Sequence, residues 1–544
     1  MAFDQTSSIQ NWRQLIEISL TGKTLRYARD PVTFDDGTVY EGRLLSMSSM
    51  ALSAGQLLDP RVTMPSLQLR LDNSDNGISD LMEDYEWSNK SVTVKIGQGT
   101  ASADYTTVFI GTILFPGGIT FDDTTASIDL DDERMKDEKV LPTSTFFATT
   151  YPNVEEKSRN FPIPIVYGDW RTSAGGGEKI PCYCVNTTTR QFKIAAHAIK
   201  SIEAVYKNGV AATLTSTDLA NAEFVMADAY DETTDTVTAN IQGATDDGTT
   251  GGTVLDTLPD IVQDILKTHL SVGSANIDSA AFTTWGTEIG ATTKARRHIA
   301  AEAASNTLIT GALIEGFADL VIIDGKYTPR YRTSGLTGLD TYRDFDMTAR
   351  RDGVKQFAVS RDPERITTNQ IVAVYRYDPS NLRYAGRFFK NDDAAITLVG
   401  TTRRRRMTYE WLYEDAASET RAERELYAFS AELEMATVGI GPRSLTKIPT
   451  DQFRLVYSKY TDASGFGIPF MIRDINIDFN QMRSTIRAWN ILTLSPGRWT
   501  AATAPTWLLS DITQRAEHGF WTDASGYADP SGSPDPTSQR SKWF

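Results

Sequence analysis

The sequence contains few of the residues that build covalent or metal-bound frameworks. Of its 544 residues only Cys182 and Cys184 are cysteines, and two cysteines cannot form a disulfide framework. One residue separates them in a segment that reads as extended, which places both thiols on the same strand face. The four histidines are scattered singly, without the spacing of a ligand set: His197, His269, His298 and His518. We therefore expect neither a bound metal nor a cofactor.

Long hydrophobic runs are also missing. No stretch approaches the roughly 18 uninterrupted apolar residues that a membrane helix requires, so we expect no membrane span. Met1–Leu20 carries Asp4, Arg13 and Glu17 and lacks the apolar core of a secretory signal, so synthesis and assembly in the cytoplasm are expected. A chain of this length exceeds a single hydrophobic core, and about three to five domains are predicted.

The chain has no excess of positive charge. Its 54 basic and 70 acidic residues give a formal net charge of -16. Because affinity for duplex DNA is built mainly from Lys and Arg that neutralise phosphates, this balance argues against general DNA binding. The acidic surface is either solubilising or suited to a channel through which DNA slides without sticking.

The first 140 residues show the two-residue alternation of half-buried strands. Leu67–Leu71, Val92–Ile96 and Ile128–Leu130 each alternate apolar with polar residues. Turn residues lie between them at Asn73–Gly77 and Pro116–Gly118. The pattern predicts an antiparallel barrel or sandwich.

A mixed region follows. Prolines before and within the apolar stretch Phe161–Trp170 indicate an edge strand at a domain boundary, and Asn208-Gly209 suits a hairpin turn. The apolar spacing of Leu258–Leu270 and of Leu308–Leu320 predicts two helices, each with a buried face. The second leads into a hairpin at Asp324-Gly325.

Strands resume beyond residue 340. The candidate strands are Phe357–Val359, Ile371–Tyr377, Phe453–Tyr457 and Phe470–Ile475, and one helix carries Ala422, Leu426, Phe429 and Leu433. The last segment, Gly519–Phe544, is rich in Gly, Ser, Pro and Asp and loses this periodicity. Such a segment either stays mobile or lies extended on a neighbouring protein.

The motifs that could indicate catalysis lack the residues that normally accompany them. Ser444 and Lys447 match the Ser-x-x-Lys spacing of penicillin-binding enzymes, but the companion Lys-Thr-Gly is absent and the flanking prolines favour a loop. The sequence also lacks a phosphate-binding Gly-Lys-Ser/Thr loop, a nucleophile elbow and a His-Glu-x-x-His motif. We expect no catalytic residues.

The acidic run between residues 122 and 138 holds eight carboxylates. A cation site or an acid–base pair is one interpretation, but the calcium-loop pattern with its central glycine is missing. Alternation around Ile128 and Leu130 sends Asp129 and Asp131 to the solvent face. We favour a solvated or lumen-facing acidic edge at these two residues.

The most basic patch consists of Arg403, Arg404, Arg405 and Arg406. In a strand these arginines divide between two faces, and we favour an interface with acidic residues of a neighbouring subunit over contact with nucleic acid. The aromatic residues of the C-terminal segment, Trp521, Trp543 and Phe544, are further interface candidates.

The order of several segments resembles phage tail-hub proteins, including the hub region of tail-tip host-specificity proteins. The segments are Val108–Ile113, Ile163–Asp169, Ser201–Val210, Leu258–Leu270, Ile277–Phe282 and Asp324–Tyr327. Together they cover about residues 100 to 500 in loose form. The resemblance rests on their order and not on any single motif.

The resemblance implies a mainly β fold with α+β inserts, in which two tail-tube-like β-barrel domains are joined by smaller mixed domains. The expected domains are an N-terminal barrel (1–160), a small β domain (161–252), an α+β domain (253–335), a second barrel with one helix (336–498) and an extended C-terminal tail (499–544). Three such chains would form a ring of six barrels beneath a sixfold tail tube.

The expected function is therefore a non-enzymatic structural hub of a virion tail tip or baseplate. A homotrimer would close the tail tube, attach other tail-tip proteins and leave a channel for DNA ejection without specific DNA binding. The implied partners are the tail-tube or distal tail protein, the tape-measure protein and tail-fibre or other tip proteins. The alternatives are a glycan-binding adhesin or depolymerase of the tail tip, and a cytoplasmic β-rich assembly protein unrelated to phage.

Overall fold

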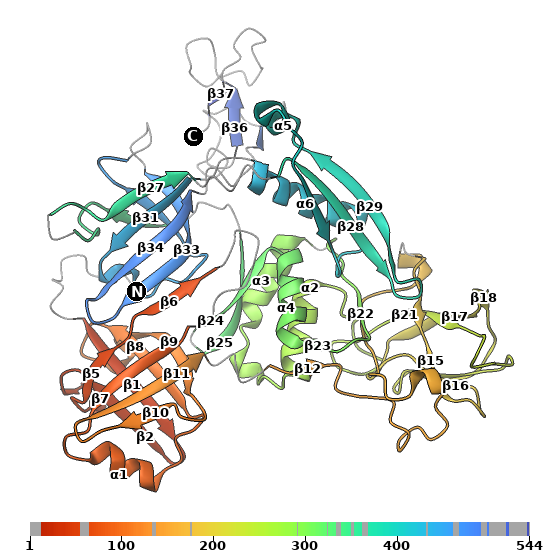
Figure 1. Ribbon diagram of the computed structural model, residues 1–544, viewed down its shortest axis with the longest axis horizontal. Helices are drawn as coiled ribbons and strands as arrows, with labels where there is room; N and C mark the ends of the chain where they lie inside the picture. The colour runs from red at the N-terminus through yellow and green to blue at the C-terminus, as the bar shows by residue number, and fades with distance from the viewer. Residues whose placement is uncertain are drawn as a thin grey trace.

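The structure is a computed structural model in which strands predominate (Figure 1). It describes residues 12–54, 65–132, 138–174, 177–290, 292–323, 325–332, 339–349, 353–361, 368–430, 434–460, 467–490, 498–499, 518–521 and 541–542. Helices are concentrated in the middle of the chain and after residue 390. The predicted fold class, mainly β with α+β inserts, is confirmed.

The N-terminal residues build the first sheet. Its strand order is β2-β1-β8-β9-β11-β7-β5, and β10 pairs with β11. The strands are β1 (Arg13–Leu20), β2 (Lys23–Ala28), β5 (Leu44–Met47), β7 (Leu67–Asp72), β8 (Ser91–Gly97), β9 (Tyr105–Ile113), β10 (Ile119–Phe121) and β11 (Thr125–Asp132). The short hairpin β3 (Val32–Thr33) and β4 (Val39–Tyr40) and the helix α1 (Gly77–Asp84) accompany it. Alternating burial along β7 and β11 confirms the predicted strands.

A second sheet comes mostly from the C-terminal part of the chain. Its order is β26-β32-β33-β34-β31-β27, and β6 pairs with β33. The strands are β6 (Met50–Ser53), β26 (Asp340–Arg343), β27 (Phe357–Arg361), β31 (Glu434–Ile440), β32 (Gln452–Val456), β33 (Ile468–Asp478) and β34 (Arg483–Asn490). Strands predicted at residues 357, 453 and 470 are thus confirmed. Among the described strands, neither sheet has a hydrogen-bonded path that returns to its first strand.

One short stretch of chain joins the two sheets. Strand β5 pairs with β7 in the first sheet, and β6, which begins three residues after β5 ends, pairs with β33 in the second. The Ser53 hydroxyl donates to the Asp474 carboxylate across this joint. Figure 1 shows the first sheet directly below the second, with β6 between them.

The two sheets share one hydrophobic core. Buried side chains of the first sheet, such as Ile18 and Leu69, belong to the same cluster as Phe453, Ile475 and Ile486 of the second. A shared apolar core removes both sheet faces from water at once and therefore holds the sheets in a fixed relation.

Two four-stranded sheets form the next part of the chain. One of these small sheets has the order β14-β21-β17-β18, and the other has the order β15-β16-β20-β19. The strands are β14 (Ile180–Pro181), β15 (Tyr183–Asn186), β16 (Gln191–Lys193), β17 (Ser201–Lys207), β18 (Val210–Ala211), β19 (Leu214–Asp218), β20 (Glu223–Met226) and β21 (Val237–Gln242). Lys207 pairs with Val210, which confirms the hairpin predicted at Asn208-Gly209.

The helices α2 (Leu258–Asp264), α3 (Ser279–Ile289) and α4 (Ser305–Glu315) pack beside the hairpin of β24 (Ala318–Ile323) and β25 (Lys326–Tyr331). The predicted helix at 258 is confirmed and continues as a π-helical turn, Ile265–His269. The helix predicted over 308–320 ends earlier, at Glu315. Phe317 has a φ of 51°, and Leu320 lies in β24, so the apolar run continues as a buried strand.

Short pairs tie this region to its neighbours. β12 (Val140–Leu141) pairs with β23 (Ala303–Ala304), and β13 (Ile165–Tyr167) pairs with β22 (Arg297–Ile299). The strand predicted near Phe161–Trp170 is thus confirmed in part, as β13. The predicted domain limits remain predictions.

A three-stranded sheet spans the far side of the molecule, in the order β29-β28-β30. Its strands are β28 (Gln370–Asp378), β29 (Arg383–Asn391) and β30 (Arg404–Thr408), and the helices α5 (Asp393–Val399) and α6 (Asp415–Ser430) follow β29 and β30. Figure 1 shows the long β28–β29 hairpin along the outer margin, with α6 on its inner side. The predicted helix around Ala422 and Leu426 is confirmed, while Leu433 lies outside the described residues.

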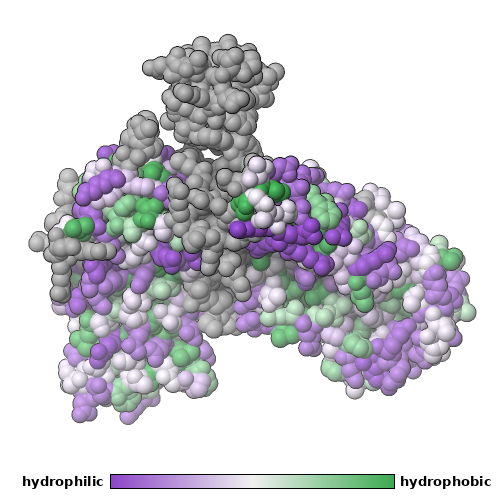
Figure 2. Space-filling view, turned by 45° about the horizontal axis from the view of Figure 1, so that its top comes forward, coloured by the Kyte–Doolittle hydropathy of each residue, from purple (hydrophilic) through white to green (hydrophobic). Residues whose placement is uncertain are grey.

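The described surface shows hydrophilic and hydrophobic residues interspersed (Figure 2). Within the described residues, no helix combines the length and apolar character that crossing a bilayer requires. Of the predicted C-terminal tail, the structure describes β35 (Arg498–Trp499), part of which precedes the tail, β36 (His518–Trp521) and β37 (Ser541–Lys542), which pair with one another.

Candidate assembly interface

The four consecutive arginines lie at the start of β30. Arg404 and Arg406 are exposed and Arg405 is half-buried between them, so the strand divides the charges between two faces as predicted. Arg403 precedes the strand, and its backbone N–H donates to the Asn369 side chain at 2.6 Å. The guanidinium of Arg404 donates to Gln370 on the adjacent strand β28 at 2.5 Å.

The aromatic interface candidates fall at the margin of the described chain. Trp521 is the last residue of β36, and its side chain is not described. Trp543 and Phe544 lie outside the described residues. Their assignment to an interface stays a prediction.

The two acidic candidates lie on β11. Asp129 and Asp131 are half-buried and alternate with Ile128 and Leu130, which are buried, so they share the face opposite the core. Gln68 of the neighbouring strand β7 donates to the Asp129 carboxylate at 2.8 Å. The structure thus places both carboxylates on the outer face, and whether that face lines a lumen stays a prediction.

The Ser-x-x-Lys residues point in different directions. Ser444 is buried, and its hydroxyl lies 2.5 Å from the Ser484 hydroxyl. Lys447 forms an ion pair with Asp340. Because the ammonium is committed to a carboxylate elsewhere, this lysine does not activate Ser444.

The cysteines and histidines occupy buried positions. Cys182 and Cys184 are free thiols in one core cluster, and burial raises the pKa of Cys184 to about 12. Such thiols are poor nucleophiles. Within the described residues, no cluster of three or more His, Cys, Asp and Glu side chains could hold a metal ion.

Two of the singly scattered histidines come together at one tyrosine. The Tyr167 hydroxyl donates to Asp264 at 2.6 Å and lies 3.1 Å from Nε2 of His269, and its ring stacks near His197. Asp264 in turn accepts from the Thr268 hydroxyl. This hydrogen-bonded cluster fixes α2 and the π-helical turn against β13, which sequence spacing alone does not reveal.

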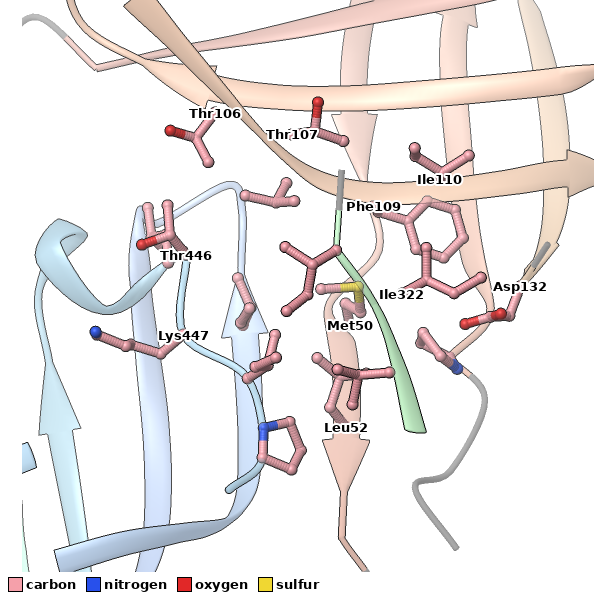
Figure 3. A pocket seen from close by; sticks show the side chains of 18 of the residues that line it. Met50, Leu52, Thr106, Thr107, Phe109, Ile110, Asp132, Ile322, Thr446 and Lys447 are labelled. Carbon is pink, nitrogen blue, oxygen red and sulfur yellow. The ribbon is translucent and has the colours of Figure 1, made fainter. Parts of the chain in front are cut away.

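A cavity lies where the two large sheets meet the β24–β25 hairpin (Figure 3). Its volume is about 140 Å³, and Met50, Phe109 and Ile322 gather in its middle, with Lys447 and Asp132 on opposite sides. These residues come from β6, β9, β24, β11 and the loop before β32. The cavity marks the junction of three parts of the chain.

One buried carboxylate connects the middle region to the segment that follows the β28–β30 sheet. Glu315, at the end of α4, accepts hydrogen bonds from the backbone N–H groups of Glu410, Trp411 and Leu412. Burial raises the pKa of Glu315 to about 7, although these three donors favour the charged form. The segment that follows β30 is thereby pinned to α4.

Buried arginines make similar connections. Arg296 is stacked between the rings of Trp170 and Tyr413, and its Nη2 lies 2.5 Å from Glu178. On α6, Nη2 of Arg421 lies 2.5 Å from Glu425 of the same helix, and both side chains are buried. Nε of Arg421 donates to the Ile314 carbonyl of α4 at 2.9 Å, which joins the two helices. Because burying such charges is costly unless they are paired, these contacts hold the parts in defined positions.

This chain has matches among solved structures only. No model of a protein family and no curated protein matches the sequence. A tail protein from Neisseria meningitidis is 9% identical, with a TM-score of 0.38 over 88% of this chain and 96% of that one. A 43 kDa tail protein of prophage MuSo2 from Shewanella oneidensis is 10% identical, with a TM-score of 0.37 over 88% and 98%.

A third structure is an Escherichia coli component of the type VI secretion system, described as structurally similar to bacteriophage tail proteins. It is 9% identical, with a TM-score of 0.33 over 92% of this chain and 89% of that one.

Proposed function

We propose that the chain is a non-enzymatic structural hub of a phage-type tail tip or baseplate, which closes the tail tube as a trimeric ring. The observation that carries this proposal is the shared core. Two multi-stranded sheets, drawn mainly from opposite ends of the sequence, pack as one unit and are joined by β6. A chain that holds two such sheets side by side supplies two of six places in a threefold ring.

The ends of both sheets suit a ring. Strands β2 and β5 end the described path of the first sheet, and β26 and β27 end that of the second. Edge strands present N–H and C=O groups that can pair with another chain. Contacts between the edges of neighbouring copies would leave fewer free edges than an isolated copy has.

The acidic character of the chain fits a passage for DNA. A net charge of -16 disfavours lasting contact with phosphates. The channel of the ring would therefore let DNA slide during ejection without specific binding. The hub would lie at the tail tip of the virion, beside the tail-tube or distal tail protein and the tape-measure protein, and would attach tail-fibre or other tip proteins.

The mass of the full chain in solution tests this proposal. A hub is expected to form trimers that also bind the tail-tube or distal tail protein. A chain that stays monomeric at every concentration and joins neither partner contradicts the proposal. Glycan binding by the isolated chain, or glycan cleavage that is lost when one carboxylate is removed, would instead establish the adhesin or depolymerase alternative.

A further inference from the structure

The outer face of the β29-β28-β30 sheet carries a compact group of arginines around an apolar centre. The strand register places Phe389, Val372 and Arg406 in one row across the sheet, and Arg387, Val374 and Thr408 in the next. Arg404 stands two residues before Arg406 on the same side of β30. We call Arg387, Arg404, Arg406, Phe389, Val372 and Val374 the arginine face.

The arginine face is separate from the core. Ile371, Ala373 and Tyr375, which alternate with the two valines, belong to the core cluster that includes Ala422 and Leu426 of α6. On β29, Lys390 points to the same side as α6, where it pairs with Glu419 and Glu423. The opposite side of the sheet therefore faces away from α6 and from this cluster. On that side Val372 and Val374 are themselves buried, and the exposed apolar side chain is that of Phe389.

The arginine face has few internal contacts within the described chain, and the Arg404 guanidinium donates to the neutral Gln370 amide. Among the described residues, no carboxylate pairs with Arg387, Arg404 or Arg406. Arg387 lies over the ring of Phe389, 4.8 Å from its centroid, and Phe389 is 53% exposed. On the three strands the alternating positions of this face hold one carboxylate, that of Asp378 at the end of β28, which accepts hydrogen bonds from Ser380 and Asn381 of the following turn. Hydrophilic residues gather at the upper right of Figure 2, the side where Figure 1 places this sheet.

The composition of this face favours a protein partner over nucleic acid. Protein interfaces combine an apolar, often aromatic centre with a charged rim and are enriched in Arg. Binding along single-stranded nucleic acid uses a positively charged groove with successive aromatic platforms, whereas this face is a sheet surface with one exposed ring. An overall charge of -16 also opposes nucleic acid and means that a second copy carries an excess of carboxylates, 70 acidic against 54 basic residues.

We propose that the arginine face binds an acidic surface of a second copy of this chain. The proposal rests on the hub function, since it concerns contacts within the ring. In it the guanidinium groups pair with carboxylates of the neighbouring copy, while the exposed ring of Phe389 supplies the apolar contact. Arginine suits this role because its planar group can bind a carboxylate through two parallel hydrogen bonds.

The test compares self-association of the full-length wild-type chain with that of the triple variant Arg387→Gln/Arg404→Gln/Arg406→Gln. Wild-type association is expected to weaken between about 0.1 M and about 1 M NaCl, because salt screens exposed charge pairs. At the lower salt concentration the triple variant is expected to associate about tenfold or more weakly, and with less dependence on salt. Sedimentation velocity measures both effects.

Three further variants serve as controls. Arg70→Gln/Arg159→Gln neutralises two exposed arginines at other sites and is expected to associate like the wild type. Arg387→Lys/Arg404→Lys/Arg406→Lys is expected to keep most of the salt dependence. Phe389→Ser removes the apolar centre without changing charge, so it should weaken association while the salt dependence remains, even if the triple variant folds poorly.

Two outcomes overturn the assignment and leave the hub proposal intact. One is a triple variant that forms trimers as tightly as the wild type. The other is a loss equal to that of Arg70→Gln/Arg159→Gln, which would show a general charge effect. Binding of a labelled single-stranded oligonucleotide that only the triple variant loses, with self-association unchanged, would assign the face to nucleic acid. Absence of any wild-type oligomer contradicts both the hub and this inference.

Discussion

The two large sheets and the middle of the molecule differ in the charged groups that their apolar cores contain. The sheets share one continuous core, and a pair of backbone strands, β6 and β33, crosses between them. The helices of the middle region share an apolar cluster with the β28–β30 sheet, and this part also contains buried charged groups, such as the Arg296–Glu178 pair and the Glu315 carboxylate that binds the segment after β30. Apolar burial therefore stabilises both parts, and the charged contacts add fixed geometry to the second.

The difference matters because the two kinds of contact have different geometric requirements. Hydrophobic contacts are non-directional, so an apolar core alone tolerates several arrangements of the parts that it joins. Buried charges are costly unless they are paired, so each buried charged contact of the middle region favours one arrangement.

The largest expected effect is the loss of a ring from the shared core. Phe453 is fully buried and packs 5.3 Å from the Tyr342 ring and 5.7 Å from that of Phe470. Phe453→Ala should lower the free energy of unfolding by about 3–5 kcal/mol, through lost transfer energy and a cavity. Because the core is shared, hydrogen exchange should rise in the first sheet as well. Exchange confined to the second sheet would contradict the shared core.

Removing one partner of the buried pair on α6 should have a similar but slightly smaller effect. Arg421→Met leaves the Glu425 carboxylate buried without its cation, which should cost about 3–4 kcal/mol of stability. The double variant Arg421→Met/Glu425→Leu should recover most of that loss, since an apolar pair needs no compensating charge. Chemical denaturation measures both. A double variant as unstable as the single one would show that the loss is one of packing.

The pH dependence of stability should carry a contribution from Glu315. Its pKa is raised from 4.5 to about 7 by burial, so the folded state keeps a proton that the unfolded state has released. This contribution is fully present below pH 4.5 and is lost as the pH rises through 7. The difference in stability between the wild type and Glu315→Gln should therefore fall by up to about 3 kcal/mol across this window. Parallel stability curves for the two chains would contradict the raised pKa.

The smallest effect is expected for the exposed ion pairs that join β29 to the same helix. Lys390 contacts Glu419 and also Glu423 at 2.7 Å, and both carboxylates are about half exposed, at 50% and 44%. Lys390→Met should change stability by at most about 1 kcal/mol, and salt should reduce the difference further. A loss as large as that of Arg421→Met would show that exposure does not separate the two pairs.

Much of the local structure was predictable from the sequence. Two-residue alternation located β7, β8 and β11, and Asn208-Gly209 located a hairpin, because these signals depend on neighbouring residues. The helix predicted over 308–320 was wrong at its end, since the apolar run from Phe317 fits a buried strand as well as a helix. Periodicity alone does not separate the two in short apolar runs.

Pairings over long distances were not predictable. β6 pairs with β33 more than 400 positions later, and the contacts between Ser53 and Asp474 leave no local signal. The division of the arginines between two faces followed from strand alternation. The sequence alone could not predict that Phe389 and Arg387 lie beside these arginines. Their proximity depends on the register of β28 against both β29 and β30.

Imaging of the assembled full-length chain tests the central claim most directly. A trimeric hub predicts a threefold ring whose inner density has six similar lobes, in which the first and second sheets alternate around an open channel. A particle without threefold symmetry, or a trimer in which the two sheets do not surround a common axis, would contradict the account.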